Sequence, residues 1–470
     1  MNNLEKFLRQ WLEPVPGDLP ALYLVGGAVR DHLLSRSPKD IDLVCRDAET
    51  FARRVARYCN ASFVPFLKKA GEPCFRVVRG KDPNIFIDIA LMRGDAITDD
   101  LRRRDFTMNA VAIQLGPGGK LGNIIDPLNG ISDMRHGLIR IPGPDAFLSD
   151  PLRMLRAVRF AAVLGFSIGE GTLSAMKAAA PRLRNTAWER ILAELTEIFK
   201  TGNSAHFIRM TDELGILEII FPEIRPMKDC DQNMFHHLDV WRHSLLVLEN
   251  CEHILSHPEE FFSVAARQVS ENLKSRNRLP LLKLAAMLHD VGKPRTRGFR
   301  EDTGRITFYG HDKKGAEIIS EIAGRLRMPK RDQEFIRILV AEHLHTLSLS
   351  APEVRFATQM RWFRKLGEDV IPLIILSMAD IMATRGPASG KEFRTRHLDW
   401  SAETVNRYFG KIREQLKRSS LISGNDLIAR NMIPGPEMGR ILRKVREAQD
   451  TGKIRNRDEA LAMAEALAEK

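Results

Sequence analysis

The hydrophobic pattern of this chain changes near residue 146, and that change restricts the possible folds more than any other sequence feature. Between residues 21 and 145, short β-type runs alternate with Gly and Pro, and one helical pattern covers 46–59; the runs are ALYLV, IDLVC, CFRVV, IFIDIAL and AVAIQL. From about 146 onward, apolar residues recur every three or four positions, as in amphipathic helices. The sequence therefore predicts an α+β fold, with a sheet domain followed by a mostly helical remainder.

Length and charge narrow the class of protein. A chain of 470 residues has room for two to four domains, and its net charge of +12 favours a polyanionic partner. The five cysteines are scattered without a C-x-x-C pair, which argues against a disulfide framework and fits a reducing cytoplasm. Charged residues near the N-terminus and the lack of an apolar run of ~18 residues predict neither secretion nor membrane insertion.

A glycine pair follows the first predicted strand. In LYLVGGAVRDHLL, Gly26 and Gly27 separate an apolar strand from a helix start that carries Arg30 and Asp31. Such a turn brings backbone N–H groups close to a phosphate. Taken alone it is more often a tight connection, and it matches neither the P-loop nor the dinucleotide fingerprint.

Two aspartates alternate along the next β-type run. In KDIDLVC, a strand would place Asp40 and Asp42 on one face and Ile41 and Leu43 on the other. A pair of Mg²⁺ ions would balance the two like charges and could serve phosphoryl transfer, and Asp88 in IFIDIAL could be the third carboxylate. The alternative is a strand edge with solvated acids, which D-x-D alone would favour. The preceding glycine turn favours the metal site.

At these residues the chain resembles the bacterial and eukaryotic class (class II) of nucleotidyltransferases, which includes the CCA-adding enzymes and bacterial poly(A) polymerases. Four segments match in family order, namely LVGGAVRDHLL with KDIDLVC, LRRRDFTMNAVA, DPLNGISDM and DPLRMLRAVRFAAVLGF. The resemblance implies a polymerase-β-like head with a mixed sheet, Mg²⁺ ligands at Asp40 and Asp42, and Asp88 as the third acid. It also implies that Gly27, Arg30 and Arg104 contact the incoming nucleotide.

Asp150 and Arg153 suit the reading of a nucleobase without a nucleic-acid template. A carboxylate accepts from the amino group of C or A while a guanidinium donates to the ring acceptor, and U and G present the opposite pattern. The resemblance supports this pair as an amino-acid template. Arg156 and Arg159 follow at three-residue spacing and match nucleotide-binding positions of the family.

A structural role for Asp150 is also possible, since it could cap a helix that begins at Pro151. The two roles are compatible. One departure from the family is visible, because Ser149 stands where the family usually has a Glu that is thought to orient the template. This departure bears on fidelity and nucleotide choice.

A histidine-rich block lies between 226 and 385 and resembles the HD metal-dependent phosphohydrolase domain. The resemblance rests on His243, the adjacent pair His289 and Asp290, and Asp380. Such residues on several helices can converge on one divalent metal with open positions for water and phosphate. Candidates to contact the phosphate or a second ion are His311, His343 and His345. Hydrolysis is possible, although such a domain can also serve as a scaffold.

These observations predict four parts: a catalytic head (1–145), a helical neck and body that selects nucleotides and binds RNA (146–225), an HD domain (226–385) and a helical tail (386–470). In residues 391–470, 17 Lys and Arg stand against 12 Asp and Glu, which makes the tail a candidate for tRNA binding. The predicted partners are tRNA, ATP and CTP.

Several functions remain open on the sequence. DPLNGISDM and the tail segment LISGNDLIARNMIPGPEMGRILRKVREAQ favour a CCA-adding tRNA enzyme. The alternatives with the same chemistry are a poly(A) polymerase and an enzyme that adds only A or only CC. A phosphohydrolase with an RNA-binding N-terminal domain is less favoured because Asp40 and Asp42 are intact. A noncatalytic RNA-binding protein is weaker still, since the chain keeps acids that would repel phosphate.

Overall fold

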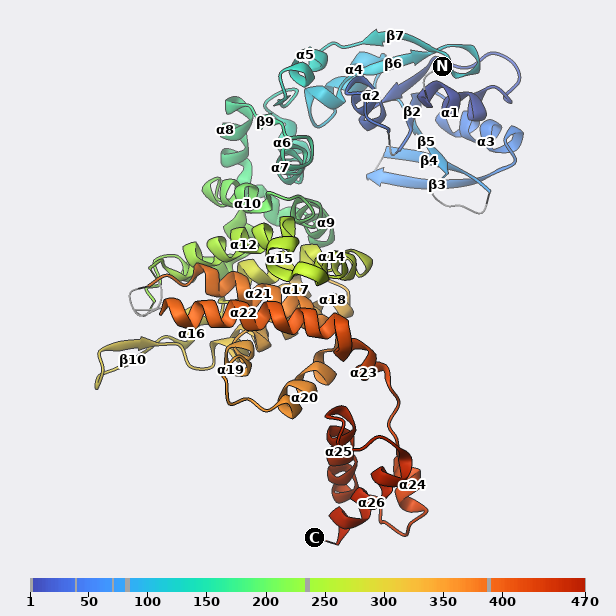
Figure 1. The fold of residues 1–470 in the computed structure, drawn as a ribbon. Helices are drawn as coiled ribbons and strands as arrows, with labels where there is room; N and C mark the ends of the chain where they lie inside the picture. Colours follow the sequence, from blue (N-terminus) through green and yellow to red (C-terminus); the bar gives the residue numbers. More distant parts are fainter. Residues whose placement is uncertain are drawn as a thin grey trace. The chain divides into compact units, whose positions relative to one another are not determined.

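The computed structural model describes residues 3–38, 40–69, 72–80, 85–232, 237–386 and 390–469 (Figure 1). The chain divides into two compact units. The first consists of Met1–Glu194 and Met210–Ile220, and the second of Leu195–Arg209 and Phe221–Lys470.

The first unit is built on a mixed sheet, as predicted. In the described residues its seven strands follow the order β3-β4-β5-β2-β1-β6-β7. Their bounds are β1 Leu22–Val25, β2 Asp42–Cys45, β3 Ala61–Lys69, β4 Glu72–Arg79, β5 Phe86–Leu91, β6 Ala112–Leu115 and β7 Leu121–Ile125. The β2 and β5 strands pair in parallel, whereas the other neighbours pair antiparallel. The predicted runs are short and rich in Val, Ile, Leu and Phe, which suits strands buried against helices.

Helices before and between the strands complete this core. They are α1 Asn3–Leu12, α2 Gly27–Leu33, α3 Ala48–Tyr58 and α4 Ile97–Arg102. The helix predicted over 46–59 is thus α3, which packs against β3, β4 and β5 with Phe51 and Val55 buried. Beside the glycine turn, Val25 and Val44 pack with Leu101 of α4 and fix the strand ends that carry the predicted acids.

The rest of the first unit is mainly helical. Its elements are α5 Gly130–Arg135, β8 Leu138–Ile139, α6 Ala146–Ser149, α7 Arg153–Leu164, β9 Ser167–Ile168 and α8 Glu170–Ala179. The helices α9 (Trp188–Phe199), α10 (Ser204–Glu213) and α11 (Leu217–Ile220) follow; α9 and α10 contribute residues to both units. The parallel pair β8 and β9 was not predicted, because strands of two residues carry no periodic signal.

The second unit is helical, as predicted for the HD region. Its helices up to the tail are α12 Val240–Ser256, α13 Pro258–Phe262, α14 Ala266–Ser275, α15 Leu279–Leu288, α16 Lys293–Thr296, α17 His311–Arg325, α18 Lys330–Glu342, α19 His345–Leu349, α20 Phe356–Leu366, α21 Val370–Ala383 and α22 Lys391–Arg407. An antiparallel pair, β10 Gly298–Arg300 and β11 Arg305–Thr307, interrupts them.

Helix α21 is the centre of this unit. All of its residues except Asp380 and Met382 are buried, and it packs against α12, α15, α18, α19 and α22 (Figure 1). The sequence VIPLIILSMADIMA is apolar around its whole circumference, which is typical of a helix enclosed by other helices. A single acidic residue near its end is therefore held in a fixed place.

The C-terminal part continues the helical pattern. A π-helical segment, Tyr408–Ile412, leads to α23 Arg413–Lys417, and α24 Gly424–Ile428, α25 Pro436–Asp450 and α26 Arg457–Ala468 follow. These last three helices share a small apolar core that includes Leu427, Ile441 and Ala460. None of the helices in the described residues combines the length and apolar character that a membrane span requires.

Candidate functional site

Strand pairing brings two of the predicted acids together in the first unit. Asp42 begins β2 and lies opposite Asp88 of the parallel strand β5. Because paired positions point to the same face of a sheet, both carboxylates project from one face. Asp88 is 5% exposed and forms a two-pronged salt bridge with Arg76 of β4, at 2.8 and 2.9 Å. That contact raises the pKa of Arg76.

Asp40 does not lie on the strand, contrary to the prediction from alternation. It is exposed in a bend two residues before β2 begins. Its place at the entrance of the strand still leaves it close in sequence to Asp42. Strict alternation would require an extended strand from Asp40 onward. Instead, Ile41 is buried and does not pair with β1, and the pairing of β2 with β1 begins at Asp42.

The glycine turn adjoins these acids. Gly26 has φ +70° and ψ −136°, a conformation open to glycine, and a Cβ there would lie 3.1 Å from Nη1 of Arg104 and 3.8 Å from Oδ2 of Asp42. Gly27 has no such positive φ, and its nearest side-chain neighbour is Arg30. The carboxylate oxygens and this close-fitting turn suit Mg²⁺, which prefers oxygen ligands and phosphate. Gly26 is thus a site residue that the predicted set omitted.

Arg104 is oriented by a buried acid. Its Nε and Nη2 donate to Oδ2 of Asp100 at 3.1 and 2.9 Å, and Nε of Arg93 donates to Oδ1 at 3.2 Å. Burial alone would raise the pKa of Asp100, but Arg104 and Arg93 outweigh it and lower that pKa below its ordinary value. A cavity of about 120 Å³ is lined by Asp42, Arg93, Asp100 and Arg104. Arg104 is therefore fixed beside the Asp42 carboxylate.

A second network connects Arg30 to the helical part of the unit. Nη1 of Arg30 donates to Oδ1 of Asn109 at 3.0 Å, and the Asn109 amide donates to Asp105 at 2.9 Å. Arg156 of α7 closes on Asp105 at 2.5 and 3.0 Å. Asp105 and Asn109 lie within the segment LRRRDFTMNAVA, so their place in that motif was the signal that could have found them.

Three predicted arginines surround one aromatic ring. The guanidinium carbons of Arg30, Arg156 and Arg159 lie 5.0, 5.5 and 4.2 Å from the centre of the Phe160 ring. Glu194 pairs with Arg159 at 2.6 Å and approaches Arg156 at 3.8 Å. The stacking on Phe160 and the ion pairs with Glu194 hold three cations close together.

The predicted base-reading pair is strongly constrained. Arg153 is 7% exposed and donates to the carbonyl oxygens of Arg103 and Ala146 at 2.7 and 3.2 Å. Asp150 accepts from Arg190 at 3.0 Å and from the Leu152 N–H at 3.3 Å. The helix α7 begins at Arg153 rather than at Pro151, so Asp150 stabilises the turn before the helix. The Arg153 guanidinium has five N–H donors, and its two bonds to the carbonyl oxygens of Arg103 and Ala146 orient it without using all of them.

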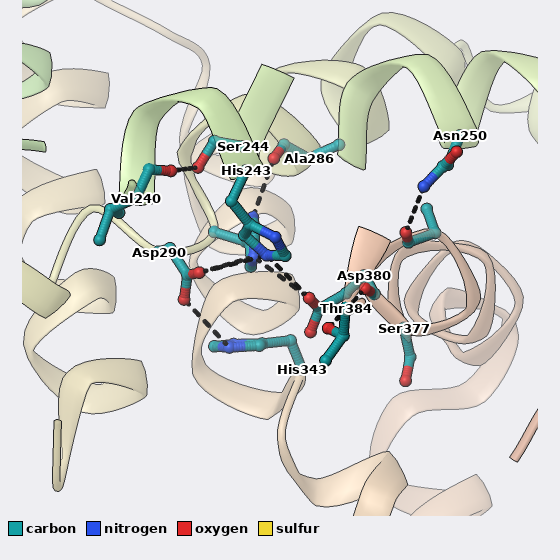
Figure 2. A network of polar contacts seen from close by, with 12 residues as sticks. Val240, His243, Ser244, Asn250, Ala286, Asp290, His343, Ser377, Asp380 and Thr384 are labelled. Atoms are coloured by element: carbon teal, nitrogen blue, oxygen red, sulfur yellow. Dashed lines mark hydrogen bonds and ion pairs between the residues drawn. The ribbon is translucent and has the colours of Figure 1, made fainter. Parts of the chain in front are cut away.

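The second unit gathers the predicted HD residues in its interior. Two groups of three residues are present, and within each group the possible ligand atoms all lie within 4.8 Å of one another. The first group is His243, His289 and Asp380; the second is Asp290, His311 and His343. Figure 2 shows His243 directed toward Asp380, and Asp290 between His343 and the first group. His345 lies apart: its side chain is half exposed and faces Glu342 at 3.4 Å.

Three of these histidines are oriented in the same way. Nδ1 of His289, His311 and His343 each bonds to the carbonyl oxygen three residues earlier, at 2.9, 2.7 and 2.7 Å. Nε2 is then the atom turned toward the acids in each case. Such backbone contacts commonly fix the tautomer of a metal-binding imidazole.

Burial and charge prepare these groups for a metal. Nε2 of His289 and Nε2 of His311 are buried and face the Asp290 carboxylate at 3.1 and 3.3 Å, and Nζ of Lys293 pairs with Oδ2 of Asp290 at 2.6 Å. Burial, with His289 and His311, lowers the pKa of His343 to about 4. For Asp290, burial opposes ionisation, but His289 and Lys293 prevail and hold its pKa well below the usual range. A neutral His343 imidazole and an ionised Asp290 carboxylate, set among further buried imidazole nitrogens, fit divalent metal ions.

Three family models match consecutive parts of the chain. They describe a poly(A) polymerase head domain over residues 22–140, a probable RNA- and SrmB-binding site of polymerase A over 165–228, and an HD domain over 240–385. The A-adding tRNA nucleotidyltransferase of Deinococcus radiodurans is 32% identical and covers 97% of this chain and 98% of its own. The chain belongs to the tRNA nucleotidyltransferase family.

Other members of the tRNA nucleotidyltransferase family show the same relationship. The CC-adding tRNA nucleotidyltransferase of Thermus thermophilus is 32% identical over 93% of this chain and 92% of its own. A multifunctional CCA protein of Pseudomonas aeruginosa is 30% identical over 69% of this chain and 74% of its own. A CCA-adding enzyme of Thermotoga maritima, solved with tRNA, shares the fold with a TM-score of 0.62, 24% identity and coverage of 99% and 94%.

Proposed function

We propose that this nucleotidyltransferase adds C and A to the 3′ end of tRNA from CTP and ATP, completing CCA. The observation that carries the proposal is the pairing of Asp42 with Asp88 beside Gly26 and Arg104. This arrangement supports phosphoryl transfer, because the carboxylates can hold cations next to a turn and an arginine that suit a triphosphate. We place the activity in the cytoplasm and keep the four-part division of the chain as part of the proposal.

In this proposal each group has a defined task. Bound Mg²⁺ would be held by Asp40 and Asp42 and would supply activation of the 3′ hydroxyl and neutralisation of the triphosphate. Arg76 keeps Asp88 in place beside Asp42. The backbone at Gly27, with Arg104 and Arg30, binds the triphosphate and ribose, and Arg156 and Arg159 add positive charge from α7. Asp150 and Arg153 read the base edge.

The extent of addition is tested with three tRNA transcripts that end before CCA, after one C, or after CC. Each is incubated with Mg²⁺ and labelled ATP or CTP, separately and together. We expect completion of CCA on all three, followed by arrest. An unlimited A tail would identify a poly(A) polymerase and contradict the proposal.

Addition of only A or only CC is the second candidate. Two relatives that match more than nine-tenths of this chain are named A-adding and CC-adding tRNA nucleotidyltransferases. Ser149, which bonds to the Ala146 carbonyl oxygen at 3.0 Å, stands where the family usually has Glu. Incorporation of A on the CC-ending transcript alone, or of C without A, would establish this reading.

We also propose that the HD site binds divalent metal and hydrolyses phosphoesters. The two groups of buried candidate ligands support it. The test pairs two variants. Asp42→Ala should abolish nucleotide incorporation and keep metal binding in the second unit. His289→Ala should abolish metal binding in the second unit and keep nucleotide incorporation. Loss of incorporation in both would contradict independent sites.

A further inference from the structure

A buried hydrogen-bonded chain lies behind the HD site and includes a histidine to which no role has been assigned. His397 of α22 is fully buried, its Nε2 lies 2.8 Å from Oγ of Ser377, and Oγ of Ser377 lies 2.5 Å from Oγ1 of Thr346. Thr346 in turn donates to the carbonyl oxygen of His343 at 2.7 Å. These hydrogen bonds thus join helices α22, α21 and α19 and end at His343, a candidate ligand of the HD site.

The protons of this chain can be assigned from its last bond. A hydroxyl has one proton, so Thr346, which donates to the His343 carbonyl, must accept from Ser377. Ser377 must then accept from His397, which makes Nε2 the protonated nitrogen. Nδ1 remains as an acceptor and faces Oγ of Ser350 at 3.1 Å; that hydroxyl also lies 2.9 Å from the Leu347 carbonyl oxygen, so its single proton serves one of the two acceptors at a time. Burial lowers the pKa of His397 to about 4, so the imidazole is neutral and can donate at one nitrogen and accept at the other.

This hydrogen-bonded chain lies close to the candidate metal ligands of the HD site. Ser377 lies one turn before Asp380 on α21, and Thr346 lies three residues after His343. Thus α21 carries both a contact to this hydrogen-bonded chain and, one turn away, the ligand candidate Asp380. Thr346 of α19 bonds back to His343, a ligand candidate of the other group, which lies at the end of α18. Figure 2 places Ser377, Asp380 and His343 in the same region of the unit. A ring stack with Trp400, at 5.7 Å and 29°, fixes the imidazole on its own helix.

We propose that His397 is a positioning residue that, through Ser377 and Thr346, holds α21 and α19 at the separation at which Asp380 and His343 can bind two metal ions. The proposal rests on the proposed metal binding of the HD site. It gives α22 a function at that site although no ligand candidate lies on α22. Groups that support metal ligands from behind typically change metal affinity by roughly tenfold to a hundredfold when removed.

The test measures two properties of the full-length protein: Mn²⁺ binding by calorimetry, and amide hydrogen exchange of residues 343–350 without metal. His397→Leu removes both polar contacts, and Thr346→Val removes only the hydroxyl. We expect both to speed exchange in 343–350 and to weaken Mn²⁺ binding about tenfold or more. His397→Gln keeps an N–H donor toward Ser377 and should restore much of the affinity. Val405→Ala, a buried change on the same helix, should leave both properties close to wild type.

Each outcome has a distinct meaning. Wild-type exchange and affinity in His397→Leu would overturn the proposal, as would equal losses in Val405→Ala. If His397→Leu does not fold, Thr346→Val decides the matter, because the change in shape is small. If the wild-type protein binds no Mn²⁺, the proposed metal site fails, and the proposed role of His397 at that site fails with it. The exchange data would then report only whether His397 orders the helices.

Discussion

Asp105 has a greater effect on its surroundings than its single charge suggests. It is 9% exposed and accepts hydrogen bonds from Arg156 and Asn109, so one carboxylate connects α7 to the segment that follows α4. Burial acts to raise the pKa of Asp105, but Arg156 and Asn109 prevail and lower it far below its ordinary value. The ionised form is therefore more favourable in the folded protein than in the unfolded chain.

This shift predicts how Asp105 contributes to stability as pH changes. Because the folded pKa is lowered, the contribution is fully present above the unfolded value near 4, begins to decline below it, and is lost as pH falls through the lowered folded pKa. We expect Asp105→Asn to lower the free energy of unfolding at pH 7 by about 1–3 kcal/mol. Urea unfolding at pH 7, 5 and 3.5 should show this difference shrinking at the lowest pH. A difference that stays constant would show that the charge is not responsible.

The two glycines of the turn should respond differently to alanine. Gly26→Ala places a Cβ against Arg104, in a backbone conformation that only glycine adopts readily. We therefore expect the free energy of unfolding to fall by more than about 1 kcal/mol and nucleotide addition to be much slower. Gly27→Ala meets only the flexible end of Arg30 and should fold normally, with its effect mainly on KM for the nucleotide. Thermal unfolding and steady-state kinetics compare the two. Equal destabilisation would contradict this difference.

Among the elements, the contact of α16 with α17 depends on a glycine. A Cβ at Gly292 would lie 2.2 Å from the carbonyl oxygen of His311 and 2.5 Å from the N atom of Gly315. Both atoms belong to the backbone of α17, so the helix itself would have to move. The segment LAAMLHDVGKP thus combines an HD pair with the glycine that lets the next helix approach it.

We expect Gly292→Ala to destabilise the second unit by about 3 kcal/mol and to displace His311 from its group. Gly324→Ala on α17 is the matched control, because nothing lies within 4 Å of its Cβ position and alanine favours a helix by up to about 1 kcal/mol. Calorimetric unfolding and Mn²⁺ binding measure the two effects. Normal metal binding in Gly292→Ala would contradict a fixed position for α17.

Sequence periodicity predicted the sheet region and the helical remainder, because both signals extend over many residues. It also predicted that Asp88 could join Asp42, which follows once β2 and β5 are neighbours. It could not place Asp40 in a bend, nor identify Asp105 as the partner of Arg156, because these depend on contacts between distant segments. His397 carried no motif, and its role depends on three helices that meet only in the fold.

For the whole molecule, the net charge of +12 predicts binding of RNA that weakens with salt. Release of counterions from phosphates makes the logarithm of affinity fall linearly with the logarithm of salt concentration. We expect the Kd for a tRNA transcript to rise roughly tenfold or more between 50 and 200 mM salt. Fluorescence anisotropy over that range measures the slope. An affinity that does not change with salt would contradict recognition through the phosphate backbone.

The five cysteines are all buried and free of disulfides, and burial raises the pKa of the Cys45 and Cys251 thiols to about 12. The thiolate is the nucleophile that attacks a maleimide, so the native chain should react slowly with maleimides. A cysteine introduced at an exposed position would then be labelled selectively without removal of any native residue. Pairs of fluorophores placed on the two compact units could follow the distance between them during successive nucleotide additions.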